Sequence, residues 1–451
     1  MNFIGQTTQL LNYSCSENNV SIQFTLSYSF HSAWNPTLSC SLPQCNTSLN
    51  GNDSCLSSPT PCFDYRTINN ISYCAPGILC SILETCNNIT QTCSSNDSVC
   101  VTNSCCSSQA VCLPFLATQM CRTGWFSTGN MTYVRRFHTA SVLSNGKVLV
   151  IGGFGIGAFS AELYDPSTGT WTTTGSMTNP RTYHIASVLS NGKILVTGGV
   201  YAGASHSAEL YDPTTGAWTT TGNMTDGRIY HTASLLSNGL VLVTGGLVNG
   251  SILLNSAELY DSSSGNWTTT GNMTIARYSH TASVLSNGKV LVTGGLGNGA
   301  FSAELYHPST GTWTTAGNMT NPRTYHTASV LLNGKVLVTG GHSVLNYLNS
   351  AELYDPSTGT WTTTGNMTNA HAEHTASVLS NGLVLVTGGL ANASILLNSA
   401  ELYDPSTGIW TTTSYMNNAR VDHTASVLSN GKVLVTGGVG NIDYLNSAEL
   451  Y

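Results

Sequence analysis

One sequence unit of 46 to 49 residues repeats from Trp125 to the end of the chain. The copy that begins at Trp171 contains, in order, Trp-Thr-Thr-Thr, a Met, an Arg, His-x-Ala-Ser, Gly-Gly and Ala-Glu-Leu-Tyr. The first copy has no Ala-Glu-Leu-Tyr segment before Trp125, and the last copy has no Trp segment after Tyr451. These two incomplete copies together make one unit. The sequence therefore predicts a closed ring whose N-terminal strand completes the last unit.

Each unit contains four strand candidates, which in the second copy are residues 171–174, 184–189, 194–197 and 208–211. Asn191-Gly192 predicts a tight hairpin turn between two of them, and the Pro/Gly-containing run 212–216 predicts another turn. The apolar run before each Gly-Gly pair is typical of a strand that neighbours cover on both faces. Four strands in each of seven units predict an all-β, seven-bladed propeller.

Three features recur in every unit, in the order Gly-Gly, Tyr, Trp. The glycine pairs begin at Gly152, Gly198, Gly245, Gly294, Gly340, Gly388 and Gly437, and the Trp residues are Trp125, Trp171, Trp218, Trp267, Trp313, Trp361 and Trp410. This order at this period resembles kelch repeats, including those of the galactose-oxidase propeller. The resemblance implies a kelch-type propeller over residues 122–451. It leaves the function open, because propellers host many unrelated activities.

All 14 cysteines lie between Cys15 and Cys121. An even number in so short a segment predicts a disulfide-stapled domain over residues 15–121, preceded by a lead-in of residues 1–14. The alternative is zinc, but no Cys-x-x-Cys pair with matching His spacing occurs. The segment also contains seven Asn-x-Ser/Thr acceptors for N-glycosylation. They are Asn12, Asn19, Asn46, Asn52, Asn70, Asn88 and Asn96.

These features predict a secreted or cell-surface protein. Residues 1–11 contain no basic residue and no long apolar run, so a signal or anchor is not visible there. No stretch reaches the roughly 18 apolar residues that a membrane-spanning helix needs. Only 8% of residues are charged, the net charge is −7 and there is no basic run. Nucleic-acid binding, which requires a basic surface, is therefore rejected.

Comparison of the repeats locates a candidate binding surface. The Ser-Asn-Gly-Lys and Asp-Pro-Ser-Thr-Gly turns barely change, whereas the segments after Gly-Gly and the position before the recurrent His change most. In an antiparallel four-stranded blade both variable sets open on one face, where kelch relatives often bind partners. We expect a protein or glycan ligand there. The candidate binding residues are Arg136, Phe137, Tyr183, Tyr230, Tyr325, Glu373 and Asp422.

Residues that occur in every blade are interpreted as structural. A recurrent His (His138 through His423) is expected to supply hydrogen bonds rather than to bind metal. The Glu of each Ala-Glu-Leu-Tyr segment is expected to pair with a recurrent Arg, which is replaced by His371 in the sixth unit. A recurrent Met is expected to pack between blades. We therefore expect no catalytic, metal-binding or cofactor-binding residue and no enzymatic activity.

Two other functions stay open. The resemblance implies, for galactose-oxidase relatives, a copper held by two Tyr and two His with one Tyr cross-linked to Cys, but no Cys follows Cys121. Glu373, Asp422 and Arg420, with Arg136 as the ring neighbour of the last blade, form the symmetry-breaking charged group in which another carbohydrate-active site would lie. The other function is a structural matrix or coat protein, for which the uniform Thr-rich blades provide bulk.

Five connections between the units also carry Asn-Met-Thr acceptors, which are Asn130, Asn223, Asn272, Asn318 and Asn366. Glycans there would crowd the proposed binding face. Either these side chains are tucked under the loop and unmodified, or the ligand binds elsewhere.

Overall fold

The chain divides into two compact units, Met1–Gly124 and Trp125–Tyr451, in a computed structural model. In the first unit the structure describes eight strands and residues 86, 87, 93, 110 and 124. In the second unit it describes every residue except 201–204, 249, 298 and 344–345. None of the described residues forms a helix that could cross a membrane.

The first unit contains four antiparallel strand pairs. These are β1 (Asn12–Glu17) with β2 (Val20–Thr25), β3 (Trp34–Asn35) with β4 (Cys40–Ser41), β5 (Cys62–Arg66) with β6 (Ser72–Pro76), and β7 (Ser98–Val101) with β8 (Val111–Pro114).

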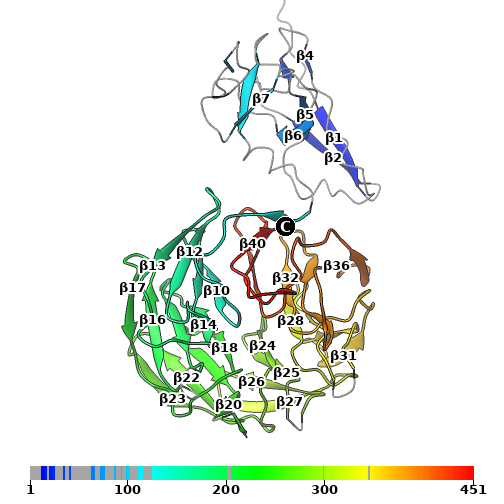
Figure 1. The fold of residues 1–451 in the computed structure, drawn as a ribbon. Coiled ribbons are helices and arrows are strands. Elements are labelled where there is room, and N and C mark those ends of the chain that lie inside the picture. The colour runs from blue at the N-terminus through cyan, green and yellow to red at the C-terminus, as the bar shows by residue number, and fades with distance from the viewer. Residues whose placement is uncertain are drawn as a thin grey trace, which may run out of the picture. The chain divides into compact units, whose positions relative to one another are not determined.

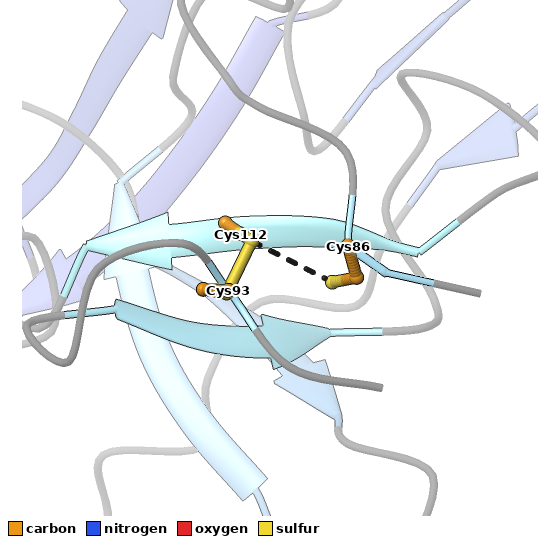
Figure 2. A group of neighbouring side chains, drawn as sticks. All are labelled: Cys86, Cys93 and Cys112. Carbon is orange, nitrogen blue, oxygen red and sulfur yellow. Dashed lines mark hydrogen bonds between the residues drawn. A yellow bond between two sulfur atoms is a disulfide. The ribbon is translucent and has the colours of Figure 1, made fainter. Parts of the chain in front are cut away.

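Two disulfides join β7 and β8 to the residues before them. Cys100 of β7 bonds Cys86, and Cys112 of β8 bonds Cys93. The sulfur atoms of Cys86, Cys93 and Cys112 lie close together, as three metal ligands would (Figure 2). Each of these sulfurs is nevertheless part of a disulfide. The disulfide prediction is therefore confirmed for four cysteines, and the pairing of the other ten lies outside the described side chains.

The second unit consists of seven four-stranded antiparallel sheets, which are the blades. Blade 1 contains β10 (Thr139–Val142), β11 (Val148–Ile151), β12 (Ala161–Asp165) and β13 (Thr170–Thr174). Blade 2 contains β14 (Ile185–Val188), β15 (Ile194–Thr197), β16 (Ala208–Asp212) and β17 (Ala217–Thr220). Blade 3 contains β18 (Thr232–Leu235), β19 (Val241–Thr244), β22 (Ala257–Asp261) and β23 (Asn266–Thr269). Blade 4 contains β24 (Thr281–Val284), β25 (Val290–Thr293), β26 (Ser302–His307) and β27 (Thr312–Asn318).

The remaining blades have the same order. Blade 5 contains β28 (Thr327–Val330), β29 (Val336–Thr339), β30 (Ala351–Asp355) and β31 (Thr360–Thr363). Blade 6 contains β32 (Thr375–Val378), β33 (Val384–Thr387), β36 (Ala400–Asp404) and β37 (Ile409–Thr412). Blade 7 contains β38 (Thr424–Val427), β39 (Val433–Thr436), β40 (Ala448–Leu450) and β9 (Phe126–Ser127). Small hairpins extend two loops, β20 (Leu247–Val248) with β21 (Ile252–Leu253) and β34 (Leu390–Asn392) with β35 (Ile395–Leu396).

The blades form a closed ring around their first strands. Each first strand contacts the first strand of the next blade, and β38 of blade 7 contacts β10 of blade 1. Figure 1 shows these strands at the centre and the fourth strands, such as β13 and β17, at the periphery. The predicted seven-bladed fold is thus confirmed.

The N-terminal strand closes the ring, as the two incomplete repeats predict. β9 pairs with β40, so that the cyan strand lies beside the red one in Figure 1. Trp125 packs against Tyr451 with ring centroids 5.1 Å apart, as Trp171 does against Tyr164 within blade 1. The last blade therefore has the same Tyr–Trp contact as a blade formed by one continuous repeat.

The hydrophobic core lies between consecutive blades. All four residues of each second strand from β11 to β39 are buried, as the apolar run predicts. In one cluster, Leu149 and Ile151 of blade 1 pack against Ile194 and Val196 of blade 2. Because every blade buries its faces against two neighbours, the core is continuous around the ring.

A buried ion pair anchors each inter-blade connection, which we define as the segment from a fourth strand to the next first strand. In blade 5, Arg323 donates to Glu352 at 2.9 Å and to the backbone oxygens of Gly340 and Ser350. Glu352 also accepts a hydrogen bond from the Thr320 backbone N–H. Six blades have this Arg–Glu pair. In blade 6, His371 takes the place of Arg and lies 3.2 Å from Glu401.

The recurrent His forms hydrogen bonds to the preceding blade. The Nε2 atom of His326, for example, lies 3.1 Å from the Thr281 hydroxyl and 3.0 Å from that of Thr293. Burial lowers the pKa of all seven, to about 3 for His184, His231, His326 and His423. These imidazoles are therefore neutral at physiological pH, and their structural interpretation is confirmed.

The ion pair provides the first testable prediction. Arg323→Ala leaves the carboxylate of Glu352 buried without its partner, so we expect a loss of about 3–5 kcal/mol in the free energy of unfolding. Arg323→His copies the natural pair of blade 6 and is expected to lose less than half as much. Urea-induced unfolding followed by tryptophan fluorescence measures both variants. Equal losses would contradict this account of the pair.

The buried histidines predict instability in acid. Their folded pKa lies below the unfolded value of about 6.5, so their contribution to stability is complete above that pH and is lost as pH falls toward 3. The loss is about 1.4 kcal/mol per pH unit for each histidine. We expect urea midpoints to fall steeply between pH 7 and pH 5. The slope of the unfolding free energy against pH counts the protons taken up on unfolding, and His326→Gln should reduce that number by one. An unchanged slope in this variant would show that His326 does not contribute.

Candidate ligand-binding site at the propeller axis

The two variable sets of segments form one face of the propeller, as predicted. The inter-blade connection 175–184 contacts the loop 152–160 between the second and third strands of blade 1, through Gly153 N–H to Arg181 O and Met177 N–H to Phe159 O, both at 2.9 Å. We call the face made by these two kinds of segment the variable face. The turns between first and second strands lie on the opposite face.

Seven residues, which we call the axial ring, end the inter-blade connections beside the first strands. They are Phe137, Tyr183, Tyr230, Ser279, Tyr325, Glu373 and Asp422, and their φ angles lie between 51° and 58°. Backbone hydrogen bonds join neighbouring members: Tyr183 N–H donates to Phe137 O, and Phe137 N–H donates to Asp422 O across the ring closure. The ring therefore includes six of the seven predicted binding residues. The seventh, Arg136, immediately precedes Phe137.

The backbone at these seven positions adopts a positive φ, which costs free energy for any residue other than glycine. A positive φ is unfavourable for bulky residues and costs of the order of 1–3 kcal/mol, whereas glycine adopts it freely. The same chain places glycine at positive φ a short distance away, for example at Gly198 and Gly199. None of the seven ring positions is glycine. We infer that the ring side chains themselves are required, for packing at the axis or for binding.

Aromatic residues occupy one sector of the ring. The centroid of Tyr183 lies 4.1 Å from that of Phe137 and 4.4 Å from that of Tyr230. Tyr325 meets Tyr230 edge-on at 6.3 Å. Burial raises the pKa of Tyr183, Tyr230 and Tyr325, so their phenols stay neutral. This sector offers aromatic surface together with hydroxyl groups that can donate or accept hydrogen bonds.

Two carboxyl groups occupy another sector. Burial, together with the charge of Glu373 and its hydrogen bond, raises the pKa of Asp422 to about 8, while Arg136 opposes the shift. The pair Glu373–Asp422 therefore retains a proton near pH 7. One carboxyl is then a hydrogen-bond donor and the other an acceptor, beside aromatic rings that accept stacking contacts.

Arg136 lies in an aromatic cluster. Its guanidinium carbon is 5.0 Å from the ring centroid of Phe137, 4.8 Å from that of Phe154 and 4.7 Å from that of Tyr444. Its Nε is buried without a hydrogen-bond partner, and among the described residues it forms no ion pair. Cation–π contacts therefore hold this charge at the axis.

Sequence comparison missed individual residues around the ring. Phe154 follows the Gly-Gly pair of blade 1 and pairs with Arg136 in an isolated β-bridge, and His342 occupies the same position in blade 5. His342 stacks on Tyr325 at 5.5 Å and contacts Tyr347 at the same distance. The position directly after Gly-Gly is the signal that could have identified them, because it pairs with the residue before the ring in every blade.

Exposed apolar side chains occur on the loops of the same face. These loops join second to third strands, and the residues are Phe154, Ile156, Phe159, Ile252, Phe301, Ile395 and Ile442. Ile156 is 90% exposed and Ile442 is 92% exposed. Apolar surface around a polar site is typical of a protein interface.

The charged group is smaller than the sequence predicts. Arg420 is buried in the Arg–Glu pair of blade 7, 2.7 Å from Glu449, and so does not join Glu373 and Asp422. The group of three close potential ligands found among the described His, Cys, Asp and Glu residues is the cysteine cluster of the first unit. The recurrent histidines bind Thr hydroxyls between blades, so the propeller residues do not fit the copper site that the resemblance implies.

Comparison with protein-family models identifies the repeats as kelch repeats. Residues 230–438 match the KLHDC2/KLHL20/DRC7 Kelch-repeats domain, and residues 135–178 and 181–225 each match the Kelch motif. The propeller belongs to the kelch-repeat family. Neither match extends into the first unit, and the sequence matches none of the curated proteins with which it was compared.

A solved structure with a similar fold is a novel fungal alcohol oxidase of the AA5 family, determined in complex with copper. It has a TM-score of 0.62 and 21% sequence identity, and the alignment covers 73% of this chain and 76% of the oxidase chain. At this identity the likeness shows a shared fold, and folds of this kind host several activities.

The carboxyl pair predicts a pH-dependent stability. Because the folded pKa of Asp422 is raised, its contribution to stability is lost as pH rises from about 4 through about 8. Asp422→Asn removes this loss, and Asn tolerates a positive φ. We expect the variant to gain stability relative to the natural chain between pH 5 and pH 9 in urea titrations. Asp355→Asn removes a half-buried carboxylate whose pKa is instead lowered by hydrogen bonds from Ser357 and by Lys335. This control should show no such gain, and parallel curves for Asp422→Asn would contradict the proton assignment.

Proposed function

We propose that this protein is a non-enzymatic, extracellular binding module that holds a protein or glycan ligand on the variable face, centred on the axial ring. The observation that carries the proposal is the break in symmetry. Buried positions, turns and ion pairs repeat from blade to blade, whereas the ring changes from aromatic residues at Tyr183 and Tyr230 to carboxyl groups at Glu373 and Asp422. A single ligand requires such an asymmetric surface.

The chemistry of the ring suits an extended ligand with an apolar or sugar face. Stacked aromatic side chains supply large contact area at a small entropy cost, and Tyr and Arg are favoured interface anchors. The Glu373–Asp422 pair adds directional hydrogen bonds beside them. The exposed Ile156, Ile252 and Ile442 around the ring favour a protein over a free sugar.

The disulfides of the first unit support an extracellular location. Disulfides such as Cys86–Cys100 and Cys93–Cys112 persist in oxidising compartments and are rare in the cytosol. Secretion or display at the cell surface would keep these bridges formed.

The competing function is oxidation of an alcohol or sugar, for which the fold likeness to the copper-containing alcohol oxidase is the supporting observation. Copper binding followed by calorimetry, together with peroxide release from a panel of sugars and primary alcohols, tests it. Stoichiometric copper uptake with turnover would favour the oxidase.

The binding proposal is tested with two probes, a displayed random-peptide library and an oligosaccharide array. The full chain, secreted from a eukaryotic cell, is screened against both. For each binder recovered, Tyr183→Ala and Tyr230→Ala are expected to weaken affinity on the order of 30-fold, the effect of removing a central aromatic anchor. Affinity is measured by surface plasmon resonance.

Matched variants separate binding from folding. Tyr183→Phe keeps the ring and removes only the hydroxyl, so it should retain most of the affinity. Ser286→Ala changes an exposed residue on the opposite face and should bind as the natural chain does. Binders that tolerate both alanine substitutions at Tyr183 and Tyr230 but lose affinity with Ser286→Ala would place the site on the other face.

A further inference from the structure

A second surface feature is repeated in five of the seven inter-blade connections. Each of these connections carries an Asn-Met-Thr sequence at or within three residues of the end of the fourth strand. The five asparagines are Asn130, Asn223, Asn272, Asn318 and Asn366, and all five are exposed. The following Met and Thr point to opposite sides: Met224, for example, is 3% exposed, whereas Thr225 is exposed.

The backbone around each of these asparagines is held in place. In blade 3, Met224 N–H donates to His206 O of the preceding blade at 2.8 Å. Thr225 N–H donates to the carboxylate of Glu258 at 2.7 Å, the same carboxylate that binds Arg228. The corresponding Thr bonds in the other four connections measure 2.6 to 2.8 Å. The ion pair of the blade thus presents the tripeptide in the same way each time.

The carboxamides themselves are free. None of the five forms a side-chain hydrogen bond within the described part of the propeller. Other asparagines of the repeat are used differently: Asn255, Asn349, Asn398 and Asn446 each donate from Nδ2 to the backbone oxygen of a recurrent Met. The Asn of each Asn-Gly turn accepts a bond from the backbone two residues later, as Asn287 does from Lys289. The Asn-Met-Thr asparagines therefore have no structural role that would explain them.

Their radial position separates them from the axial ring. Each follows a fourth strand, at the periphery of its blade, while the ring adjoins the first strands at the centre (Figure 1). Three strand spacings of about 4.8 Å separate the first strand from the fourth, or roughly 14 Å. A group attached at Asn223 or Asn318 therefore extends outward from the rim. The alternative that these side chains are tucked under the loop is wrong, because all five asparagines are exposed.

We propose that these five asparagines carry N-linked glycans, which form a sugar-covered rim around an open axial site. In the transfer, Nδ2 of Asn bonds to the anomeric carbon of a lipid-diphosphate-linked oligosaccharide. The bond from that carbon to the diphosphate oxygen breaks, the lipid diphosphate leaves, and the nitrogen releases one proton. The exposed Thr hydroxyl completes the acceptor sequence.

The two remaining connections are natural controls. Ser176-Met177-Thr178 and Tyr415-Met416-Asn417 have the same backbone contacts, including Thr178 N–H to Glu209 and Asn417 N–H to Glu449. The first lacks only the acceptor asparagine, and the second lacks both the asparagine and the Thr. Ser176 is exposed, so Ser176→Asn creates a sixth Asn-Met-Thr in the same geometry.

The test uses the full chain translated with endoplasmic-reticulum microsomes and also secreted from a eukaryotic cell behind a heterologous leader. Gel mobility before and after enzymatic deglycosylation counts the glycans, and peptide mass spectrometry assigns them. We expect occupancy at all five asparagines. Asn223→Gln and Thr225→Ala should each remove one glycan, Thr225→Ser should keep it, and Ser176→Asn should add one.

The outcomes decide the proposal. Glycans on first-unit acceptors such as Asn12 or Asn46 would show that the transferase reached the molecule. If all five propeller asparagines were unmodified in that same chain, the proposal would be overturned. A secreted chain without any glycan would overturn it as well. The microsome assay does not depend on secretion, so a variant that fails to leave the cell still gives a result.

Discussion

The buried Arg–Glu pair is the interaction on which the rest of the propeller depends. Its two charges lie where three segments meet: the third strand, the loop after the Gly-Gly pair, and the inter-blade connection. Arg323 donates to Gly340 and Ser350 in that loop, while Glu352 receives the N–H groups of Thr320 and Asn321 in the connection. A buried charge needs such complete satisfaction, because removing either partner leaves the other without water or counter-charge. The natural replacement by His371 retains the same two kinds of contact.

This anchoring sets the path of each connection from rim to axis. At its outer end the connection exposes Asn and buries Met, and at its inner end one residue has a positive φ beside the first strand. One repeated constraint thus generates both surfaces discussed above: a ring of free asparagines at the periphery and a ring of seven side chains at the centre. The scaffold fixes their positions in every blade, so function can change through side-chain identity alone.

Much of the candidate site could be predicted from the sequence. Variation before the recurrent His identified Tyr183, Tyr230 and Asp422, because a repeat protein provides its own comparison among positions of equal structure. One partner of Arg136 could not be found in this way. Tyr444 comes from the variable loop of blade 7, and no alignment of repeats brings it to Arg136 of the first connection. The assignment of Arg420 to the charged group was wrong for a related reason, since repeat register does not show which way a side chain is buried.

The sequence by itself determined the number of blades, the four strands of each, the closure by Trp125 and the pairing of Glu with Arg. These follow from periodicity and from the need to satisfy buried charge, and both are local properties repeated seven times. Only the tertiary structure decided which non-equivalent residues meet at the axis and which asparagines stay free. Those contacts join side chains far apart in the chain, and their positions depend on how the ring closes.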